Sequence, residues 1–218
     1  MSAARHLLVR QMLGWRVAKE EAVLPFPVER GRVPSVRHVR SGLLCSSIQT
    51  LRTRGLFDDY LSKLPKENHA RILSLTAAEW IDPELAFVHY EALDKVPMTE
   101  AQIEENGVQV AQQLQRGFLS VVLRLVAESG VTPWSVLERY QRLWERYFQG
   151  SAIAVWKTGP KDARAEVVSF PLARIRYIQV GVGGIMRGAL ELVCKRAYVR
   201  LVRVESTPTS LVYRISWA

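Results

Sequence analysis

The last third of the chain limits the fold most narrowly, because its pattern predicts a β-hairpin, a helix and a second β-hairpin. An apolar run at 152–156 and a returning strand at 165–170 flank a cluster of turn residues. Near the end, 198–204 and 211–217 each alternate apolar with polar or basic residues, the period of a strand with one buried face. The segment between the hairpins is too long for a loop and has helical spacing. An antiparallel sheet with one helix between its two hairpins follows from this pattern.

The front half of the chain predicts helices. Asp82-Pro83 and Thr132-Pro133 are start signals, and Thr99 with Gln102 forms a capping box that opens a helix continuing to near Gly130. Apolar residues recur at helical spacing after each of these signals. The predicted fold class is therefore α+β, an N-terminal helical bundle followed by a C-terminal hairpin–helix–hairpin antiparallel sheet.

The first 36 residues differ in character from the rest. They begin with a basic amphipathic pattern, and Pro25, Pro27 and Pro34 then interrupt regular structure. We expect residues 1–36 to be a basic N-terminal arm and linker, and residues 37–218 to be a single α+β ligand-binding-like domain.

Charge and cysteine content limit the classes of function. The formal net charge is +9, with the basic excess at the two ends of the chain and a slightly acidic middle. The two cysteines, Cys45 and Cys194, stand far apart and in no metal-ligand or redox spacing. No apolar run approaches the ~20 residues that cross a bilayer. We expect a cytoplasmic protein without a membrane span.

Several short motifs give the chain a resemblance to known proteins. They comprise segments 42–44 and 61–65, Trp80 with Asp82-Pro83, segment 144–148 before Gly150, and segment 213–217. With these motifs, residues 41–218 resemble a paralogous family of uncharacterised myxobacterial proteins. The fold that this resemblance implies is the one shared by vinyl-reductase-like domains, haem–nitric-oxide-binding domains and certain TRAPP subunits.

The resemblance implies a compact domain, often a homodimer, with an apolar pocket for a small hydrophobic ligand, an acyl chain or a tetrapyrrole. The candidate pocket residues are His89, Cys45, Trp80, Trp144 and Tyr147. His89 lies on the apolar face of a helix, where a histidine is either an axial ligand to haem iron or a core residue hydrogen-bonded to a neighbour. Cys45 is either an acylated or reactive thiol, or a small buried hydrophobe.

Haem-dependent sensing is one alternative function. The haem–nitric-oxide-binding relatives carry a Tyr-x-Ser-x-Arg motif for the haem propionates. The nearest segment here, 60–64, has Leu64 in place of the arginine. We therefore predict no cofactor.

Glycines at 181, 183 and 184 precede an apolar helical pattern and suggest a nucleotide-binding loop, but Met186 stands where that fingerprint needs its third glycine. We expect these glycines instead to let the helix lie close to the sheet or to a twofold partner, where a Cβ would not fit.

Arg200, Arg203 and Arg214 predict a basic face on the second hairpin, either a solvated sheet edge or a contact for nucleic-acid phosphates. No Ser-His-Asp, paired-carboxylate or metal-ligand spacing stands out. The sequence thus predicts a non-enzymatic sensory or scaffolding domain that binds a small hydrophobic ligand, a protein partner or both. A nucleic-acid-associated protein is the first alternative and a haem-dependent sensor the second.

Overall fold

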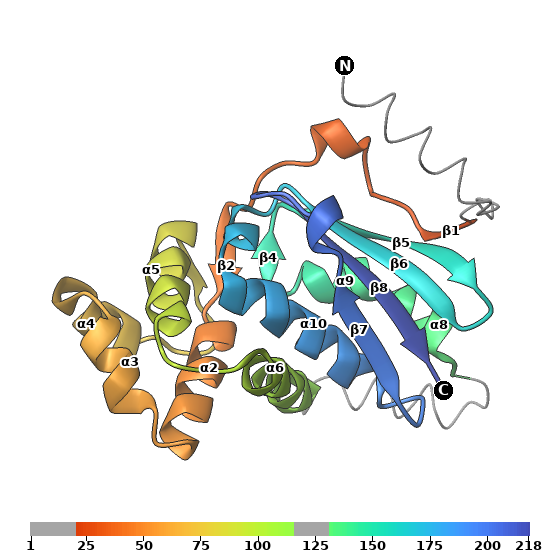
Figure 1. The fold of residues 1–218 in the computed structure, drawn as a ribbon. Helices are drawn as coiled ribbons and strands as arrows, with labels where there is room; N and C mark the ends of the chain where they lie inside the picture. Colours follow the sequence, from red (N-terminus) through yellow and green to blue (C-terminus); the bar gives the residue numbers. More distant parts are fainter. Residues whose placement is uncertain (1–20, 116–130) are drawn as a thin grey trace.

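A computed structural model describes residues 21–115 and 131–218. The fold is mixed α+β with antiparallel sheets. A group of helices lies at one end, the main sheet lies at the other, and helix α10 (Arg176–Leu190) runs between them (Figure 1).

The main sheet has five strands in the order β1-β5-β6-β8-β7. Their bounds are β1 (Glu21–Leu24), β5 (Ala152–Gly159), β6 (Asp162–Val168), β7 (Ala197–Leu201) and β8 (Leu211–Trp217). Every neighbouring pair is antiparallel. On β8, Tyr213, Ile215 and Trp217 are buried whereas Arg214 is exposed, as the alternating pattern predicts. One face of the sheet thus carries the core, and the connection between the two hairpins contains the short helix η2 (Pro171–Arg174) and α10.

Helix α10 packs closely against α6 (Glu100–Gln115) because small residues face each other. A Cβ placed on Gly184 would collide with the carbonyl oxygen of Glu104, and one on Gly107 would collide with that of Gly181. Gly183 points the other way, where a Cβ would lie 3.4 Å from the ring of Tyr213 on β8. The close approach that excludes a Cβ is therefore to α6 of the same chain, whereas a Cβ on Gly183 would meet the sheet at an ordinary contact distance.

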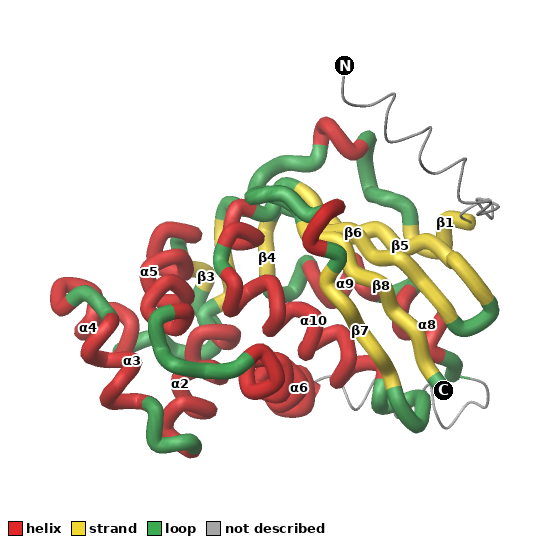
Figure 2. The backbone as a smooth tube through the Cα atoms, in the orientation of Figure 1, coloured by secondary structure: helices red, strands yellow, loops and turns green. Residues whose placement is uncertain are grey.

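The remaining helices lie around this centre. They are α2 (Gly42–Thr53), α3 (Phe57–Lys63), α4 (Lys66–Leu73), α5 (Pro83–Asp94), α8 (Pro133–Leu137) and α9 (Tyr140–Trp144). A small antiparallel sheet joins β3 (Trp80–Ile81), β2 (His38–Arg40) and β4 (Phe148–Gln149) (Figure 2). The front half is thus not entirely helical. The expected helix after Thr132 is two short helices, α8 and α9. The later part of the helix predicted from Thr99 to Gly130 lies outside the described residues, as does the basic amphipathic pattern at 1–20.

Residues 21–36, expected to form part of the arm and linker, pack on the sheet. Strand β1 pairs with β5, with Ala22 opposite Trp156. After the short helix η1 (Arg30–Arg32), Val33 is buried beside Ala152 and Val168. The prolines do interrupt regular structure, but the N–H of Ser151 donates to the carbonyl oxygen of Pro34, and the N–H of Val36 donates to that of Ser169. Residues before the boundary expected at 37 thus add a strand and a buried side chain to the main sheet.

The second hairpin also differs from the prediction. Strand β7 ends at Leu201, and Arg203 begins the short helix η3 (Arg203–Glu205) instead of continuing the strand. The backbone N–H of Val202 still donates to the carbonyl of Val212, and the chain then turns. No helix among residues 21–115 and 131–218 is long and apolar enough to cross a membrane.

Candidate functional site

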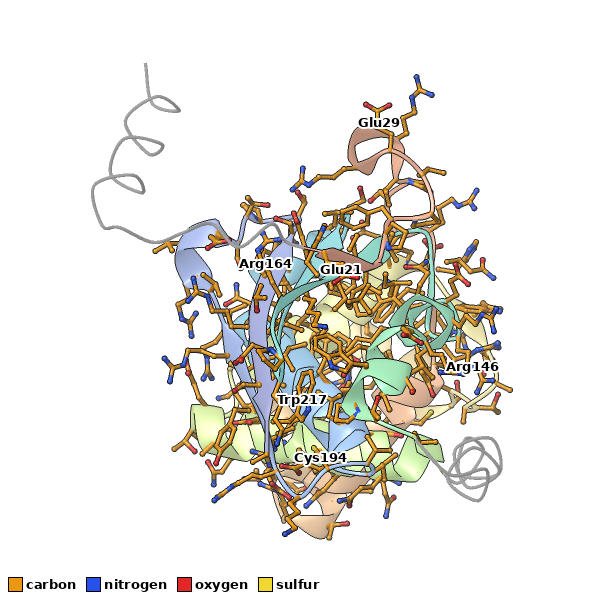
Figure 3. All side chains as sticks on the ribbon, turned by 90° about the vertical axis from the view of Figure 1, so that its right-hand side faces the viewer. Glu21, Glu29, Arg146, Arg164, Cys194 and Trp217 are labelled. Atoms are coloured by element: carbon orange, nitrogen blue, oxygen red, sulfur yellow. The ribbon has the colours of Figure 1, made fainter. Side chains whose placement is uncertain are left out.

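An apolar cavity of about 120 Å³ lies where the helical layer meets the sheet. Helix α10 supplies the longest part of its wall, and α2, α5, α6, α9, β4 and β5 supply the rest. Most lining residues are aliphatic or glycine. The lining residues with polar atoms in their side chains are Ser47, Tyr90, Tyr140, Trp144, Tyr147 and Tyr177. Figure 3, turned by 90°, shows side chains filling the interior between the sheet and the helices around this region.

No Lys, Arg, Asp, Glu, His or Cys belongs to the described wall. Transfer of a charged group into such a space is strongly unfavourable without a partner of opposite charge. The cavity is therefore suited to a neutral ligand. Its half-buried members, Leu143, Tyr147, Ile185 and Ala189, mark the side nearest solvent within the part of the chain that the structure describes.

Two of the five pocket candidates, Trp144 and Tyr147, line the cavity. Residues 137–148 belong to two short helices and the start of β4, and Tyr140, Trp144 and Phe148 among them are buried. Trp144 packs against Phe148 and Phe170, with ring centroids 4.4 and 5.0 Å apart. The Tyr140 hydroxyl donates to the carbonyl oxygen of Met186 across a distance of 3.1 Å.

Sequence reasoning missed Tyr90 and Tyr177 as wall residues. Their rings stack at a centroid distance of 6.0 Å and an interplanar angle of 25°. A signal for Tyr177 was present, since it falls on the same face of α10 as Ile185 and Ala189, which had suggested the helix. Tyr90 follows His89 directly, and only the tertiary fold shows that it is Tyr90 that faces the cavity.

His89 lies behind the wall and is fully buried. Its Nε2 is 2.7 Å from the Ser47 hydroxyl, and its Nδ1 is 2.6 Å from the Tyr60 hydroxyl. The Ser47 hydroxyl donates to the carbonyl oxygen of Leu44 at 2.8 Å, so it must accept from His89 Nε2–H. Tyr60 then donates to the unprotonated Nδ1, a tautomer that the hydrogen-bond pattern assigns.

Burial lowers the pKa of His89 to about 3, which keeps the imidazole neutral. Burial also raises the pKa of Tyr60, so the phenol keeps the proton that it donates. The arrangement is that of a core histidine hydrogen-bonded to its neighbours, and it links α2, α3 and α5 through side chains.

Cys45 and Trp80 lie away from the described wall of the cavity. The Cys45 thiol donates to the carbonyl oxygen of Leu75 at 3.5 Å, and burial raises the pKa of this thiol, which disfavours the reactive thiolate. The guanidinium of Arg40 lies over the ring of Trp80, 4.0 Å from the ring centroid. The structure therefore does not bring the five candidates into one site.

The three arginines of the predicted basic face do not all lie together in the structure. Arg200 and Arg214 lie directly opposite each other on β7 and β8, and Arg164 lies opposite Arg214 on β6. Arg203 instead forms an ion pair of 2.6 Å with Glu100. Arg164, which sequence reasoning missed, therefore belongs to this row of arginines, and Arg203 does not. Residues 200 and 203 are an odd number of positions apart, which already argued against a shared strand face.

No protein-family model and no curated protein matches the sequence. Solved structures do match the fold. A mutant H-NOX protein from K. algicida, solved in the Fe(II) unliganded form, has a TM-score of 0.63 at 9% identity and covers 82% of this chain and 96% of its own. The chain has the H-NOX fold. An oxygen-binding H-NOX domain related to soluble guanylate cyclases has a TM-score of 0.56 at 16% identity, covering 82% and 94%. A mutant of T. Tengcongensis H-NOX has a TM-score of 0.58 at 15% identity, covering 82% and 97%.

The resemblance to haem–nitric-oxide-binding domains stated from sequence motifs is thus confirmed for the fold. Whether the chain binds haem depends on the residues at the site and not on the fold alone. In the described part of the chain, no group of three or more His, Cys, Asp or Glu is placed to hold a metal ion. Both nitrogens of His89 are already bonded to hydroxyls, and His89 is outside the wall.

The tyrosines of the wall do not supply an iron ligand either. Burial raises the pKa of Tyr90, Tyr140, Tyr147 and Tyr177, which opposes the phenolate form that binds iron. The cavity of about 120 Å³ is also smaller than the roughly 300–1,000 Å³ of typical cofactor sites. The described residues therefore do not fit a haem.

Proposed function

We propose that this protein is a non-enzymatic sensory or scaffolding domain whose cavity binds a small, neutral, hydrophobic ligand. The observation that carries the proposal is a largely buried apolar cavity without charged groups in its described wall. Natural cores are close-packed, and voids of this size are few in a domain. A well-formed apolar pocket with a few polar groups in its wall is the default candidate for a ligand site.

The position of the cavity supports a sensory role. Its wall combines residues from both layers, so an occupant contacts α2, α6, α9 and α10 together. Ser47 belongs to that wall and also to the hydrogen bonds that hold His89 and, through it, Tyr60 on α3. A ligand that displaces Ser47 would thus change the packing of α3, which supplies no residue to the described wall. A neighbour in fold that is described as oxygen-binding supports a ligand-binding role for the fold in general.

The test combines native mass spectrometry with a cavity-filling variant. A bound molecule appears as extra mass in the native spectrum that disappears on denaturation, and benzene, as a small apolar probe, should raise the melting temperature of protein without ligand. Gly181→Leu places a side chain at the wall, since a Cβ there meets only ordinary contacts at 3.9 and 4.0 Å. This variant should keep the fold by circular dichroism and lose both effects. If Gly181→Leu keeps both the extra mass and the rise in melting temperature with benzene, the proposal is refuted.

The same native mass gives the number of subunits. We propose a homodimer, as the family resemblance implies, and a protein partner as the receiver of the signal. A native mass of one chain at micromolar concentration would refute the dimer without affecting the ligand proposal.

A second candidate function, association with nucleic acid, is favoured by one observation. Three arginines lie in directly opposite positions on adjacent strands, at 164, 214 and 200. Arg164 is paired with Glu166 at 3.4 Å and with Glu205 at 3.3 Å, while Arg200 and Arg214 are exposed on the same sheet face, where basic side chains can contact phosphate groups. An affinity for RNA or DNA that falls steeply with added salt, and that Arg200→Ala weakens, would support this function. An affinity independent of salt or of Arg200 would count against it.

A further inference from the structure

The outer face of the main sheet, turned away from the core, carries an exposed aromatic ring beside basic side chains. On the edge strand β7, Val199 and Leu201 pack against the core, so Tyr198 and Arg200 point to the opposite face. Tyr198 is 53% exposed. The guanidinium of Arg196, just before β7, lies 5.7 Å from the Tyr198 ring centroid. This face therefore presents an aromatic surface and positive charge together.

A row of arginines crosses the sheet next to Tyr198. Arg200 on β7 lies opposite Arg214 on β8, and Arg214 lies opposite Arg164 on β6. Arg164 is paired with two glutamates, whereas no carboxylate among the described residues pairs with Arg200. A positive charge without a carboxylate partner thus lies two residues from the exposed ring, on the same face.

The neighbouring row of the sheet has a different charge. Ser216 on β8 lies opposite Tyr198, and the exposed Asp162 on β6 lies opposite Ser216. An anion is therefore favoured along the row of arginines and disfavoured at the far end of the row that contains Tyr198. The Tyr198 ring is left for an uncharged group of the same partner.

A single strand of nucleic acid combines these two chemistries. Its phosphates are negative, and its unpaired bases expose ring faces that stack on aromatic side chains. Tyr198 and Arg200 are roughly 7 Å apart along the strand, close enough for one base and a neighbouring phosphate to contact both. The bases of a duplex are already stacked on each other, so a duplex offers this face only its phosphates. A second copy of the same face is unsuited, because two rows of arginines would meet.

We propose that the outer face of the main sheet binds single-stranded nucleic acid, with a base stacked on Tyr198 and phosphates along the row that contains Arg200 and Arg214. This inference rests on the second candidate function, association with nucleic acid, and names the class of nucleic acid and the side chain that selects it.

The test measures binding of the full chain by fluorescence anisotropy at low salt, with an oligothymidylate of about ten nucleotides and a duplex of the same length. Wild type should bind the single strand more tightly than the duplex. Tyr198→Ala should weaken binding of the single strand about five- to a hundredfold and leave the duplex unchanged. Tyr198→Phe keeps the ring and should bind as wild type does.

Two further variants complete the design. Arg200→Ala should weaken binding of both probes and reduce the slope of log affinity against log salt by about one. Leu73→Ala is the control for loss of an exposed apolar side chain, since Leu73 is 40% exposed on α4, far from the sheet (Figure 1). It should change neither affinity.

The outcomes separate the two proposals. If Arg200→Ala weakens binding of both probes but Tyr198→Ala weakens neither, stacking on Tyr198 is refuted and association with nucleic acid stands. If neither probe binds wild type even at low salt, both proposals fail. If polyglutamate of similar length competes as well as the single strand, the face recognises negative charge alone, as in an acidic protein segment, and the inference is refuted.

Discussion

Ser47 lines the cavity and its hydroxyl lies 2.7 Å from Nε2 of His89, so one residue connects the ligand space to a fully buried histidine. Its proton goes to the carbonyl oxygen of Leu44, which leaves its oxygen as the acceptor for the imidazole N–H. His89 then depends on Ser47 for the partner of that N–H, and on Tyr60 for the partner of its other nitrogen.

Ser47→Ala should destabilise the protein, because it leaves the buried Nε2–H of His89 without an acceptor. The expected loss in the free energy of unfolding is about 1–3 kcal/mol, measured by urea denaturation. Ser62→Ala is the matched control, since the hydroxyl of Ser62 donates to a carbonyl three residues earlier in the same way but is exposed. Equal losses for the two variants would contradict the role of Ser47.

Stability should depend on pH through His89. Because burial lowers its pKa to about 3 in the folded state, the unfolded chain, with an ordinary pKa near 6.5, binds the proton first. Stability is therefore fully present above about 6.5 and falls as the pH drops from 6.5 towards 3, with a limiting slope of about 1.4 kcal/mol per pH unit. Urea denaturation at several pH values between 7 and 5 should show a steeper fall for wild type than for His89→Gln. Parallel profiles would show that His89 is protonated equally in both states.

Local signals in the sequence identified much of the fold. The predicted capping box forms, with the N–H of Thr99 bonded to the side chain of Gln102 and the N–H of Gln102 to the hydroxyl of Thr99. These features depend on residues three or four positions apart, and such spacings are visible in a sequence. The pairing of β1 with β5 depends on residues more than a hundred positions apart, and no short pattern records it.

The candidate site, like the fold, could be predicted from the sequence only in part. Trp144 and Tyr147 could be proposed from the spacing of aromatic residues along a helical pattern. That Trp144 lines a cavity depends on where Phe148, Phe170 and α10 come to lie. The position of His89 on an apolar face was visible in the sequence, but the two hydroxyls that hold it come from α2 and α3. A choice between metal ligand and core residue therefore needed the fold.

Gly150→Ala should loosen the segment that leads from the arm into the domain. Gly150 has φ 87°, and a Cβ there would collide with the carbonyl oxygen of Ser35. The variant adds backbone strain to this collision, and the expected loss is about 2–4 kcal/mol. Gly55→Ala is the control for strain alone, because Gly55 has φ 68° and nothing within 4 Å of its Cβ position. Melting temperatures should fall much further for Gly150→Ala, and similar falls would mean that Ser35 moves away without cost.

Two glycines three residues apart on α10 should respond to alanine with opposite signs. Gly184→Ala forces a Cβ into the carbonyl oxygen of Glu104 on α6, and overpacking of this kind costs about 1–3 kcal/mol. Gly181→Ala meets only ordinary contacts, 3.9 Å from Tyr177 and 4.0 Å from Ile103, so the higher helix propensity of alanine should stabilise the protein by up to about 1 kcal/mol. Since Gly181 lines the cavity, the same change should also weaken the binding of benzene. Chemical denaturation and calorimetry measure the two effects separately. A stabilised variant with weakened binding would show that the glycine at 181 is retained for the space it leaves, whereas destabilisation would show that α10 cannot accept a side chain on that face.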